Sequence, residues 1–571
     1  MNNFLENYQK WVHSDALSSE EKAELQAIAK DPKEIEFRFT KGLSFGTAGL
    51  RGTMKTGMAA MNRHTVAHAT QGLACLILKL HREKDGVAVA CDSRNNSPLF
   101  AKTAACVLAA NGIKAYLFDE LRPTPELSFA LRELKCVAGI NITASHNPKE
   151  YNGYKAYWED GAQLPPEHAD IVSEEIERLD IFRDVKIMEY EEALQKGLIE
   201  IIGAEIDEKY LAQVEAQAVN PSAVAKVADT LSIVYTPLHG TGHKLVPAIM
   251  RRIGLKNLYT VDEQMVIDGN FPTVKKPNPE YPDVFNLGIA IANKVGSDLV
   301  IATDPDADRV GVMTRTPDGS FDVITGNQMG ALLADYIITA YKESNTMPQN
   351  PYMVKSIVST ELATKVCAAN GIKMHNVLTG FKFIGEVIKN YEKTGDGSFL
   401  FGFEESYGYL KGTYARDKDA VVASMLICEM TAFYKAKSMT LSDALSALWE
   451  KYGYCYEENE EIYMEGLDGA ARMAALMDSL RNDPPKSFGG VAVEMIADYK
   501  TGVITKNGET TPTGLPSSNV LYYQLENGDV IVARPSGTEP KIKYYYMLSA
   551  KDRDDAKEKI AQYRTVLSQR A

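Results

Sequence analysis

Three aspartates at alternate positions, Asp304, Asp306 and Asp308, follow an apolar segment of the sequence. In an extended loop this spacing can turn three carboxylates toward one hard divalent cation, because such cations prefer oxygen ligands. An EF-hand is excluded, since Arg309 and Arg315 stand where that loop requires glycine and glutamate. The triplet therefore predicts a Mg²⁺ site, in which three protein ligands leave room for a phosphoryl oxygen.

A hydroxyl group in a second polar loop could act as a nucleophile. Ser145 lies in the sequence Thr-Ala-Ser-His-Asn-Pro at residues 143–148, again after an apolar segment. The Gly-x-Ser-x-Gly elbow of α/β hydrolases is absent, so the serine alone is a weak signal. Asn152 and Lys155 add turn-forming and cationic character nearby. Together these residues suit a loop that holds a phosphate.

Further loops carry groups that suit a sugar phosphate. Residues 534–538 offer a guanidinium, two hydroxyl groups and a glycine N–H, which can form a neutralising cradle for a phosphate dianion. Their spacing is not that of a Walker loop. Glu404 and Ser406 supply acceptors and a donor for sugar hydroxyls, and the glycine-rich segment 46–52 adds Arg51. Each of these signals is weak by itself.

An internal repeat indicates the elements that must position these loops. The string Ala-Ala-Asn-Gly-Ile-Lys occurs at 109–114 and again at 368–373, and a weaker copy, Arg-Arg-Ile-Gly-Leu-Lys, occupies 251–256. Each copy follows an apolar run and an amphipathic stretch, the order of a βαβ unit in which the glycine ends the helix. Chance similarity of short strings is the alternative. A second apolar run after each copy ends in a polar loop, so we expect three related units to contribute loops to one composite site.

The C-terminal part has a different pattern. Residues 490–546 alternate apolar and polar residues around Asn-Gly turns at 507–508 and 527–528, as expected of an α+β domain. We therefore predict an α/β protein with three similar sheet domains and a smaller, divergent α+β domain at the C-terminus. The predicted domains span residues 1–212, 213–324, 325–455 and 456–571.

Composition argues against several classes of partner. Acidic residues outnumber basic ones by 76 to 62, a net charge of −14, and no long basic run is present, so nucleic acid is not an expected partner. No apolar run approaches the roughly 18 residues of a membrane span, and no secretory leader is evident. The seven cysteines form no Cys-x-x-Cys pair, as in a protein with reduced thiols. We expect a soluble cytoplasmic protein without a membrane partner.

In this order the loops resemble the motifs of the α-D-phosphohexomutase family, and most closely those of its α-phosphoglucomutases. The resemblance spans nearly the whole chain, and its motifs are Thr143–Pro148, Asp304–Arg309, Gly402–Ser406 and Arg534–Pro540. Four motifs in sequence order are far more specific than any one of them. The resemblance implies four domains around a deep central cleft, three of them similar α/β domains and the fourth divergent.

The resemblance also implies an activity. It implies an isomerase of carbohydrate metabolism in which Ser145 is carried as phosphoserine, with one Mg²⁺ held by its phosphoryl oxygen and by Asp304, Asp306 and Asp308. The phosphoserine would give its phosphoryl group to the 6-hydroxyl of glucose 1-phosphate. The bisphosphate would then turn around and return its 1-phosphoryl group to the serine. Glucose 6-phosphate would leave, with glucose 1,6-bisphosphate as activator.

The remaining site residues follow from the same resemblance. Lys155 is the candidate for proton transfer beside the phosphoserine, with Arg51 and His146 as further catalytic residues. The substrate-binding residues would be Glu404, Ser406, Lys382, Arg309, Arg534, Ser536, Gly537 and Thr538. Sugar phosphates are the expected partners, and the chain is expected to be a monomer or a weak dimer.

The identity of the sugar remains open on the sequence alone. The loop Glu404-Glu405-Ser406 favours glucose, and a hydroxyl at Ser406 argues against a pentose. However, residues 46–52 and 149–153 also resemble the branch that includes phosphopentomutases and glucose 1,6-bisphosphate synthases. Phosphomannomutase activity on the same scaffold is a further alternative, because one residue does not settle specificity.

Two readings from other classes are weaker. An apolar strand followed by Asp304-x-Asp306 also begins haloacid-dehalogenase-like phosphatases, in which Asp304 would be the nucleophile. That reading leaves the loops of Ser145 and Arg534 unexplained. A catalytically silent sugar-phosphate-binding protein is the other alternative, and no residue favours it.

Overall fold

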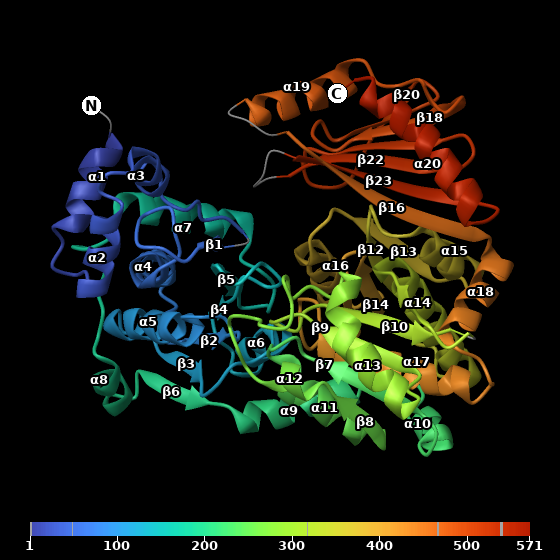
Figure 1. The fold of residues 1–571 in the computed structure, drawn as a ribbon, viewed down its shortest axis with the longest axis horizontal. Helices are drawn as coiled ribbons and strands as arrows, with labels where there is room; N and C mark the ends of the chain where they lie inside the picture. The colour runs from blue at the N-terminus through green and yellow to red at the C-terminus, as the bar shows by residue number, and fades with distance from the viewer. Residues whose placement is uncertain (1–2, 48, 317, 465–467, 537–540, 571) are drawn as a thin grey trace. The chain divides into compact units, whose positions relative to one another are not determined.

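The computed structural model describes residues 3–47, 49–316, 318–464, 468–536 and 541–570 (Figure 1). The chain forms two compact units. Unit 1 comprises residues 1–324, 388–390 and 408–438, and unit 2 comprises residues 325–387, 391–407 and 439–571.

Unit 1 begins with a small helical cluster made of α1 (Asn3–Val12), α2 (Ser19–Ala27) and α3 (Pro32–Phe39). Polar caps set the helix starts: Ser18 and Glu21 form a capping box before α2, and Asp31 caps α3. Trp11 and Phe39 are buried at the centre of the cluster.

The first sheet of unit 1 has six strands in the order β1-β5-β4-β2-β3-β6. The central pairs are parallel, whereas β5 runs antiparallel to both β4 and β1. The strands are β1 (Leu50–Thr53), β2 (Val87–Cys91), β3 (Ala115–Phe118), β4 (Ala138–Ile142), β5 (Tyr151–Trp158) and β6 (Ile199–Ile202). The helices are α4 (Arg63–Lys79), α5 (Ser97–Ala110), α6 (Thr124–Glu133), α7 (Pro166–Arg178) and α8 (Tyr190–Gln195).

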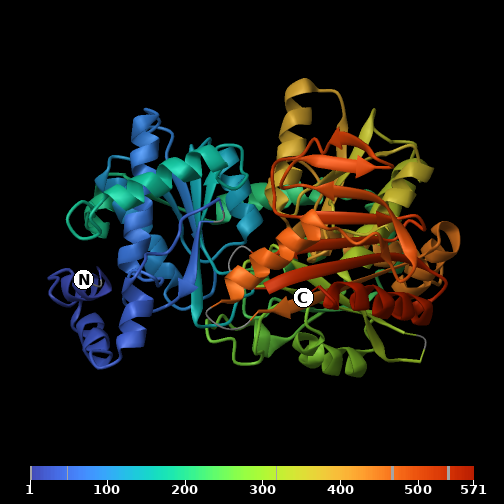
Figure 2. The ribbon, with the colours of Figure 1, turned by 90° about the horizontal axis from the view of Figure 1, so that it is seen from above.

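The strand order reverses next to β2. The chain passes from β2 through α5 to β3, and then back through α6 to β4 on the other side of β2. Right-handed crossovers therefore put α5 and α6 on opposite faces, and Figure 2 shows this sheet edge-on between helices. Ligands bind where the carboxyl ends of strands flank such a reversal. Asp92 follows β2 at this edge, and the loop of Ser145 follows β4.

The second sheet of unit 1 has the order β11-β10-β9-β7-β8, with β7 parallel to β8 and β9. Its strands are β7 (Ser232–Thr236), β8 (Asn257–Thr260), β9 (Leu299–Thr303), β10 (Val310–Arg315) and β11 (Phe321–Ile324). The helices of this part are α9 (Ala204–Glu215), α10 (Ser222–Val227), α11 (Gly242–Arg252), α12 (Asp262–Met265), the 3-10 turn η1 (Pro282–Phe285) and α13 (Asn286–Val295). The later segments β15 (Gly408–Leu410) and α17 (Ala420–Lys435) also belong to unit 1.

Unit 2 contains a parallel sheet and a larger antiparallel sheet. The parallel strands are β12 (Pro351–Ser356), β13 (Lys373–Val377) and β14 (Ser398–Glu404), with α14 (Gly326–Glu343), α15 (Glu361–Ala369), most of α16 (Phe381–Thr394) and α18 (Leu441–Tyr452). The second sheet has the order β16-β23-β22-β21-β18-β19-β20, with β17 (Ser487–Phe488) paired to β18. Its other members are β16 (Tyr454–Tyr463), β18 (Val491–Asp498), β19 (Val503–Lys506), β20 (Glu509–Pro512), β21 (Leu521–Leu525), β22 (Val530–Pro535) and β23 (Lys541–Ala550), accompanied by α19 (Gly469–Asn482) and α20 (Arg553–Ser568).

The structure confirms the repeat. Gly112, Gly254 and Gly371 follow α5, α11 and α15, and each has a positive φ, as the helix-ending role requires. The hairpin predicted at Asn507-Gly508 joins β19 to β20. Three α/β sheets and a C-terminal antiparallel domain agree with the predicted fold class.

One of the three predicted domain limits falls between two elements, and the other two fall within an element. The limit at 324/325 coincides with the end of β11 and with a change of compact unit. Those at 212/213 and 455/456 fall inside α9 and at the start of β16. Within the described residues, every helix is too short or too polar to span a bilayer.

Candidate functional site

Ser145 lies in the loop between β4 and β5 with an unusual backbone. Its φ is +52°, in the left-handed region, and its N–H donates to Thr143 Oγ1 at 2.8 Å. Serine seldom adopts this conformation, so surrounding contacts must hold it. The Oγ atom lies 3.0 Å from Asp304 Oδ2 and 3.1 Å from His146 Nδ1. The loop thus presents a buried hydroxyl to a carboxylate and an imidazole.

A buried guanidinium, which the sequence analysis did not single out, holds this loop. The Nη atoms of Arg94 donate to four backbone carbonyls, those of Ser145 at 2.5 Å, Asn147 at 2.6 Å, Pro148 at 2.9 Å and Tyr151 at 3.0 Å. Asp92 Oδ2 lies 3.2 Å from Arg94 Nε, and both side chains are fully buried. The four bonds fix the carbonyl directions of the loop and thereby maintain the strained φ of Ser145. The available sequence signal was the charged triplet Asp-Ser-Arg directly after the apolar strand β2.

The three aspartates follow β9 and converge as predicted. Each offers a carboxylate oxygen within 4.8 Å of the other two, and all three residues are buried. Asp304 Oδ1 accepts from the backbone N–H groups of Asp308 and Arg309 at 3.1 and 3.0 Å, which folds the loop around its first carboxylate. Burial and the charges of Asp306 and Asp308 raise the pKa of Asp304 well above its usual range.

Two of these carboxylates keep an oxygen without a hydrogen-bond donor. Asp306 Oδ1 and Asp308 Oδ1 are buried and accept no hydrogen bond from the described residues, although Arg309 Nε lies 3.9 Å from Asp308 Oδ1. An unpaired buried carboxylate oxygen is costly unless a cation satisfies it. Three buried carboxylates with two such oxygens form the donor set of a hard divalent cation, so the residues fit the predicted metal.

Two lysines flank the carboxylates. Lys155 Nζ, on β5, lies 2.7 Å from Asp306 Oδ2 and 3.5 Å from Asp308 Oδ2. Lys418 Nζ lies 3.1 Å from Asp308 Oδ2 and 2.9 Å from Asp417 Oδ1. Burial favours a neutral Lys155, but the charges of Asp306 and Asp308 prevail and raise its pKa. Lys155 is therefore an ammonium group at neutral pH.

Lys418 was not among the residues predicted from the sequence. It lies in a loop before α17, and the only sequence signal was the alternating run Arg-Asp-Lys-Asp at 416–419. These four residues are buried, which is unusual for a charged run. Tyr157 on β5 donates to Asp417 Oδ2 at 2.9 Å and so fixes this loop beside Lys155.

The predicted residues His146, Arg51 and Arg309 lie around Ser145. Burial, together with the charges of Arg309 and Arg51, lowers the pKa of His146 well below its usual range, so its imidazole is neutral. Arg51, on β1, donates to Asn147 Oδ1 at 3.2 Å and so contacts the serine loop. Arg309 follows the aspartates and pairs with Glu280.

Unit 2 carries the predicted sugar loop. Glu404 ends β14, and its Oε1 accepts from Gly380 N at 2.7 Å, where φ of +123° favours glycine. Lys382 lies in the first turn of α16, and burial lowers its pKa. Glu405 Oε2 accepts from Ser356 Oγ at 2.9 Å, while burial and Glu404 raise the pKa of Glu405 to about 7.

The predicted phosphate loop lies at the end of β22 in the same unit. Arg534 donates to Tyr545 Oη at 3.3 Å, and Ser536 N donates to Lys541 O at 2.8 Å. Burial and the charges of Glu405 and Glu404 raise the pKa of Tyr545. Unit 2 therefore carries both the predicted sugar loop and the predicted phosphate loop. The predicted residues Gly537 and Thr538 lie outside the described residues.

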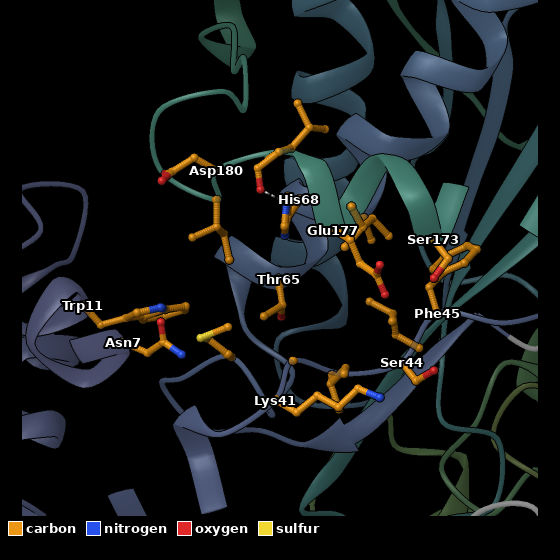
Figure 3. Close-up of a pocket in the computed structure, with 18 of the residues that line it drawn as sticks. Asn7, Trp11, Lys41, Ser44, Phe45, Thr65, His68, Ser173, Glu177 and Asp180 are labelled. Atoms are coloured by element: carbon orange, nitrogen blue, oxygen red, sulfur yellow. Dashed lines mark hydrogen bonds between the residues drawn. The ribbon is translucent and has the colours of Figure 1, made fainter. Parts of the chain in front are cut away.

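A cavity of about 270 Å³ elsewhere in unit 1 contains none of the predicted site residues (Figure 3). Trp11 and Asn7 of α1, His68 of α4 and Glu177 of α7 line it, together with Lys41. His68 is tied to the backbone, since its Nε2 lies 3.0 Å from Leu179 O. The predicted chemistry is therefore separate from this cavity.

Comparisons with known proteins agree with the geometry. The chain matches three family models: phosphoglucomutase/phosphomannomutase alpha/beta/alpha domain I over residues 42–181, domain II over 208–319 and domain III over 325–452. A phosphoglucomutase of Staphylococcus saprophyticus is 38% identical over 516 residues, covering 90% of this chain and 92% of the relative. The phosphoglucomutase of Staphylococcus haemolyticus is 36% identical over 530 residues, which cover 92% of this chain and 94% of the relative.

Solved structures share the fold. The open form of the Paramecium phosphoglucomutase parafusin matches with a TM-score of 0.70 at 19% identity, covering 92% of this chain and 94% of that chain. At this identity the likeness supports the fold alone.

Proposed function

The chain belongs to the phosphoglucomutase/phosphomannomutase family, and from this membership we propose that it interconverts α-D-glucose 1-phosphate and glucose 6-phosphate. It is an isomerase that moves a phosphoryl group within a sugar phosphate. Relatives named phosphoglucomutase, 36% and 38% identical over most of the chain, support glucose over the other sugars.

One observation carries the mechanism: the Ser145 hydroxyl lies 3.0 Å from Asp304 in a cluster whose other two aspartates keep unpaired oxygens. In the proposed reaction Ser145 is carried as phosphoserine. The bond from phosphorus to Ser145 Oγ breaks as a new bond forms to the 6-hydroxyl oxygen of the sugar. The sugar hydroxyl loses a proton and Ser145 Oγ gains one. After reorientation of the bisphosphate, Ser145 Oγ loses its proton and attacks the 1-phosphoryl group. The bond from phosphorus to the sugar 1-oxygen then breaks, and that oxygen takes up a proton to give glucose 6-phosphate.

Neighbouring side chains are suited to the proton transfers. Lys155 is an ammonium group beside Asp306, and we assign to it the proton that Ser145 Oγ takes up as it leaves. Asp304 Oδ2, to which Ser145 Oγ donates at 3.0 Å, and neutral His146, with Nδ1 at 3.1 Å from Oγ, are the two candidates to accept the hydroxyl proton when the serine attacks. Arg51 and Arg309 add positive charge for the phosphoryl oxygens, whose charge must be stabilised in the transition state.

Asp304, Asp306 and Asp308 would hold Mg²⁺, with the phosphoryl oxygen of phosphoserine as a further ligand. When bound, the cation neutralises charge on the transferring phosphoryl group. Glucose 1,6-bisphosphate would serve as activator, because it phosphorylates Ser145 when the enzyme has lost its phosphoryl group.

The residues of unit 2 would bind the substrate. Glu404 and Ser406 would contact the 3- and 4-hydroxyls of the sugar, which face the same way in both orientations of the bisphosphate. Arg534, Ser536, Gly537 and Thr538 would bind the phosphate that is not being transferred, with Lys382 as an additional cation. The four predicted domains, cytoplasmic location and a monomer or weak dimer complete the proposal.

The test is a competition followed by phosphorus NMR. Purified enzyme with Mg²⁺ and a trace of glucose 1,6-bisphosphate is given equal amounts of glucose, mannose, glucosamine and ribose 1-phosphates. We expect glucose 6-phosphate to form first. Mannose 6-phosphate or ribose 5-phosphate as the leading product would reject the sugar assignment, and inorganic phosphate would reject the mutase activity.

A further inference from the structure

A relay of hydrogen bonds joins the strand before Ser145 to a carboxylate of the metal cluster. Thr124 Oγ1 donates to Asp306 Oδ2 at 2.8 Å, and Asn141 Nδ2 donates to Thr124 Oγ1 at 2.7 Å. Thr124 N also donates to Asp306 O at 2.9 Å. Thr124, Asn141 and Asp306 are each fully buried. Asn141 is on β4, four residues before Ser145, whereas Thr124 begins α6.

Which group donates and which accepts at each step of the relay follows from the protons that the groups carry. A carboxylate only accepts hydrogen bonds, and a threonine hydroxyl has one proton. Because Thr124 gives that proton to Asp306, its oxygen must accept from Asn141. The backbone N–H of Thr124 is one of the groups that a helix start leaves unpaired, and Asp306 O satisfies it. The first turn of α6 is thereby bonded to both the backbone and the side chain of Asp306.

The relay determines which oxygen of Asp306 remains for a cation. Asp306 Oδ2 receives Thr124 Oγ1 and Lys155 Nζ, the latter at 2.7 Å, while Oδ1 has no donor among the described residues. The two donors on Oδ2 fix the rotation of the Asp306 carboxylate, and Oδ1 is left to face the aspartate cluster. Hydrogen bonds of this kind orient metal ligands, and their loss typically lowers metal affinity about 10- to 100-fold.

We propose that Thr124, itself oriented by Asn141, is a positioning residue that aims Asp306 Oδ1 at the divalent cation. The inference rests on the metal site of the proposed function, and Thr124 acts through Asp306 without touching the substrate. It also makes the ligand geometry depend on β4, the strand that leads into the Ser145 loop.

The experiment measures Mn²⁺ affinity by electron paramagnetic resonance on the full chain, with all proteins brought to the same phosphoserine content. Thr124→Val removes the hydroxyl at nearly constant shape and should weaken Mn²⁺ binding at least tenfold. Thr124→Ser keeps the hydroxyl and should stay within about threefold of wild type. The control is Thr431→Val: among the described residues the hydroxyl of this buried threonine bonds its own helix, through Ile427 O at 2.6 Å, and its loss should leave Mn²⁺ affinity unchanged. Wild-type affinity in Thr124→Val would overturn the proposal.

Asn141 provides a second, independent test. In Asn141→Asp the new carboxylate cannot donate and competes with Asp306 for the single hydroxyl proton, so Mn²⁺ binding should weaken. In Asn141→Leu the hydroxyl still donates to Asp306, and the loss should be smaller. The reverse order would reject the relay. Binding is measured without turnover, so an absence of mutase activity in wild type would reject the proposed function and leave this result interpretable.

Discussion

Ser145 Oγ lies 3.0 Å from Asp304 Oδ2, although 159 positions separate the two residues. Each stands beyond the carboxyl end of a buried strand, β4 for Ser145 and β9 for Asp304. Their contact makes one site from two sheets of unit 1. The hydroxyl is therefore adjacent to the carboxylates that a cation would share with a phosphoryl group on Ser145.

Replacement of the nucleophile is the first prediction. Ser145→Ala should abolish mutase activity, because no other hydroxyl contacts Asp304 among the described residues, and should leave the melting temperature nearly unchanged. Coupled assay of glucose 6-phosphate and intact mass of the phosphoenzyme measure the effect. Ser424→Ala removes another buried hydroxyl, on α17, and should remain active. Near wild-type turnover in Ser145→Ala would exclude this serine as nucleophile.

Loss of a metal ligand should change the cation requirement. Asp306→Asn removes the charge that pairs with Lys155 and that would bind the cation, so activity at low Mg²⁺ should fall at least tenfold. Titration of activity against Mg²⁺ and calorimetry of Mg²⁺ binding are the measurements. Asp322→Asn, an exposed change on β11, is the matched control. An unchanged Mg²⁺ dependence would show that Asp306 is not a ligand.

Arg94→Lys tests whether the four hydrogen bonds from Arg94 to backbone carbonyls position the Ser145 loop. A lysine ammonium group is compact and lacks the planar guanidinium with which arginine reaches four carbonyls. We expect kcat to fall about 100-fold with a small change in KM, because a misplaced nucleophile affects the chemical step. In Arg94→Ala, added guanidinium ion should restore part of the rate. Arg38→Lys, at a buried arginine of the N-terminal cluster, should keep normal kcat. Equal loss in both lysine variants would mean that the effect is one of general stability.

Lys411 provides a prediction about pH and stability. Burial lowers the pKa of Lys411 to about 8, although Glu429 opposes this shift. An unfolded lysine titrates near 10.4, so between about pH 8 and 10 the unfolded chain binds more protons at this position. Stability from this group therefore rises with pH in that window and is constant below it. The slope is at most about 1.4 kcal/mol per pH unit.

The comparison uses Lys411→Met, which keeps the length of the side chain. Urea denaturation at pH 7, 8, 9 and 10 gives the stability of wild type minus that of the variant. This difference should rise between pH 8 and 10 and stay flat below pH 8. A difference that is flat throughout would mean that Lys411 titrates normally in the folded protein.

The sequence by itself determined the local architecture and the chemistry of each loop. The apolar run expected before each copy of the glycine string is a strand in the structure, β2, β7 or β12, and the helices end at Gly112, Gly254 and Gly371 as predicted. These features depend on local periodicity and on the backbone freedom of glycine, which neighbouring residues suffice to set. The aspartate cluster was predictable for the same reason, since its members are two residues apart.

Only the tertiary structure decided which distant groups meet. Arg94 contacts Ser145, 51 positions later, and Thr124 contacts Asp306 over 182 positions. Lys418 joins the cluster through Asp308. Such contacts depend on how strands from separate βαβ units are packed, and no local pattern encodes that packing. The residue types on each loop thus follow from the sequence, whereas their alignment into one reactive geometry follows from the fold.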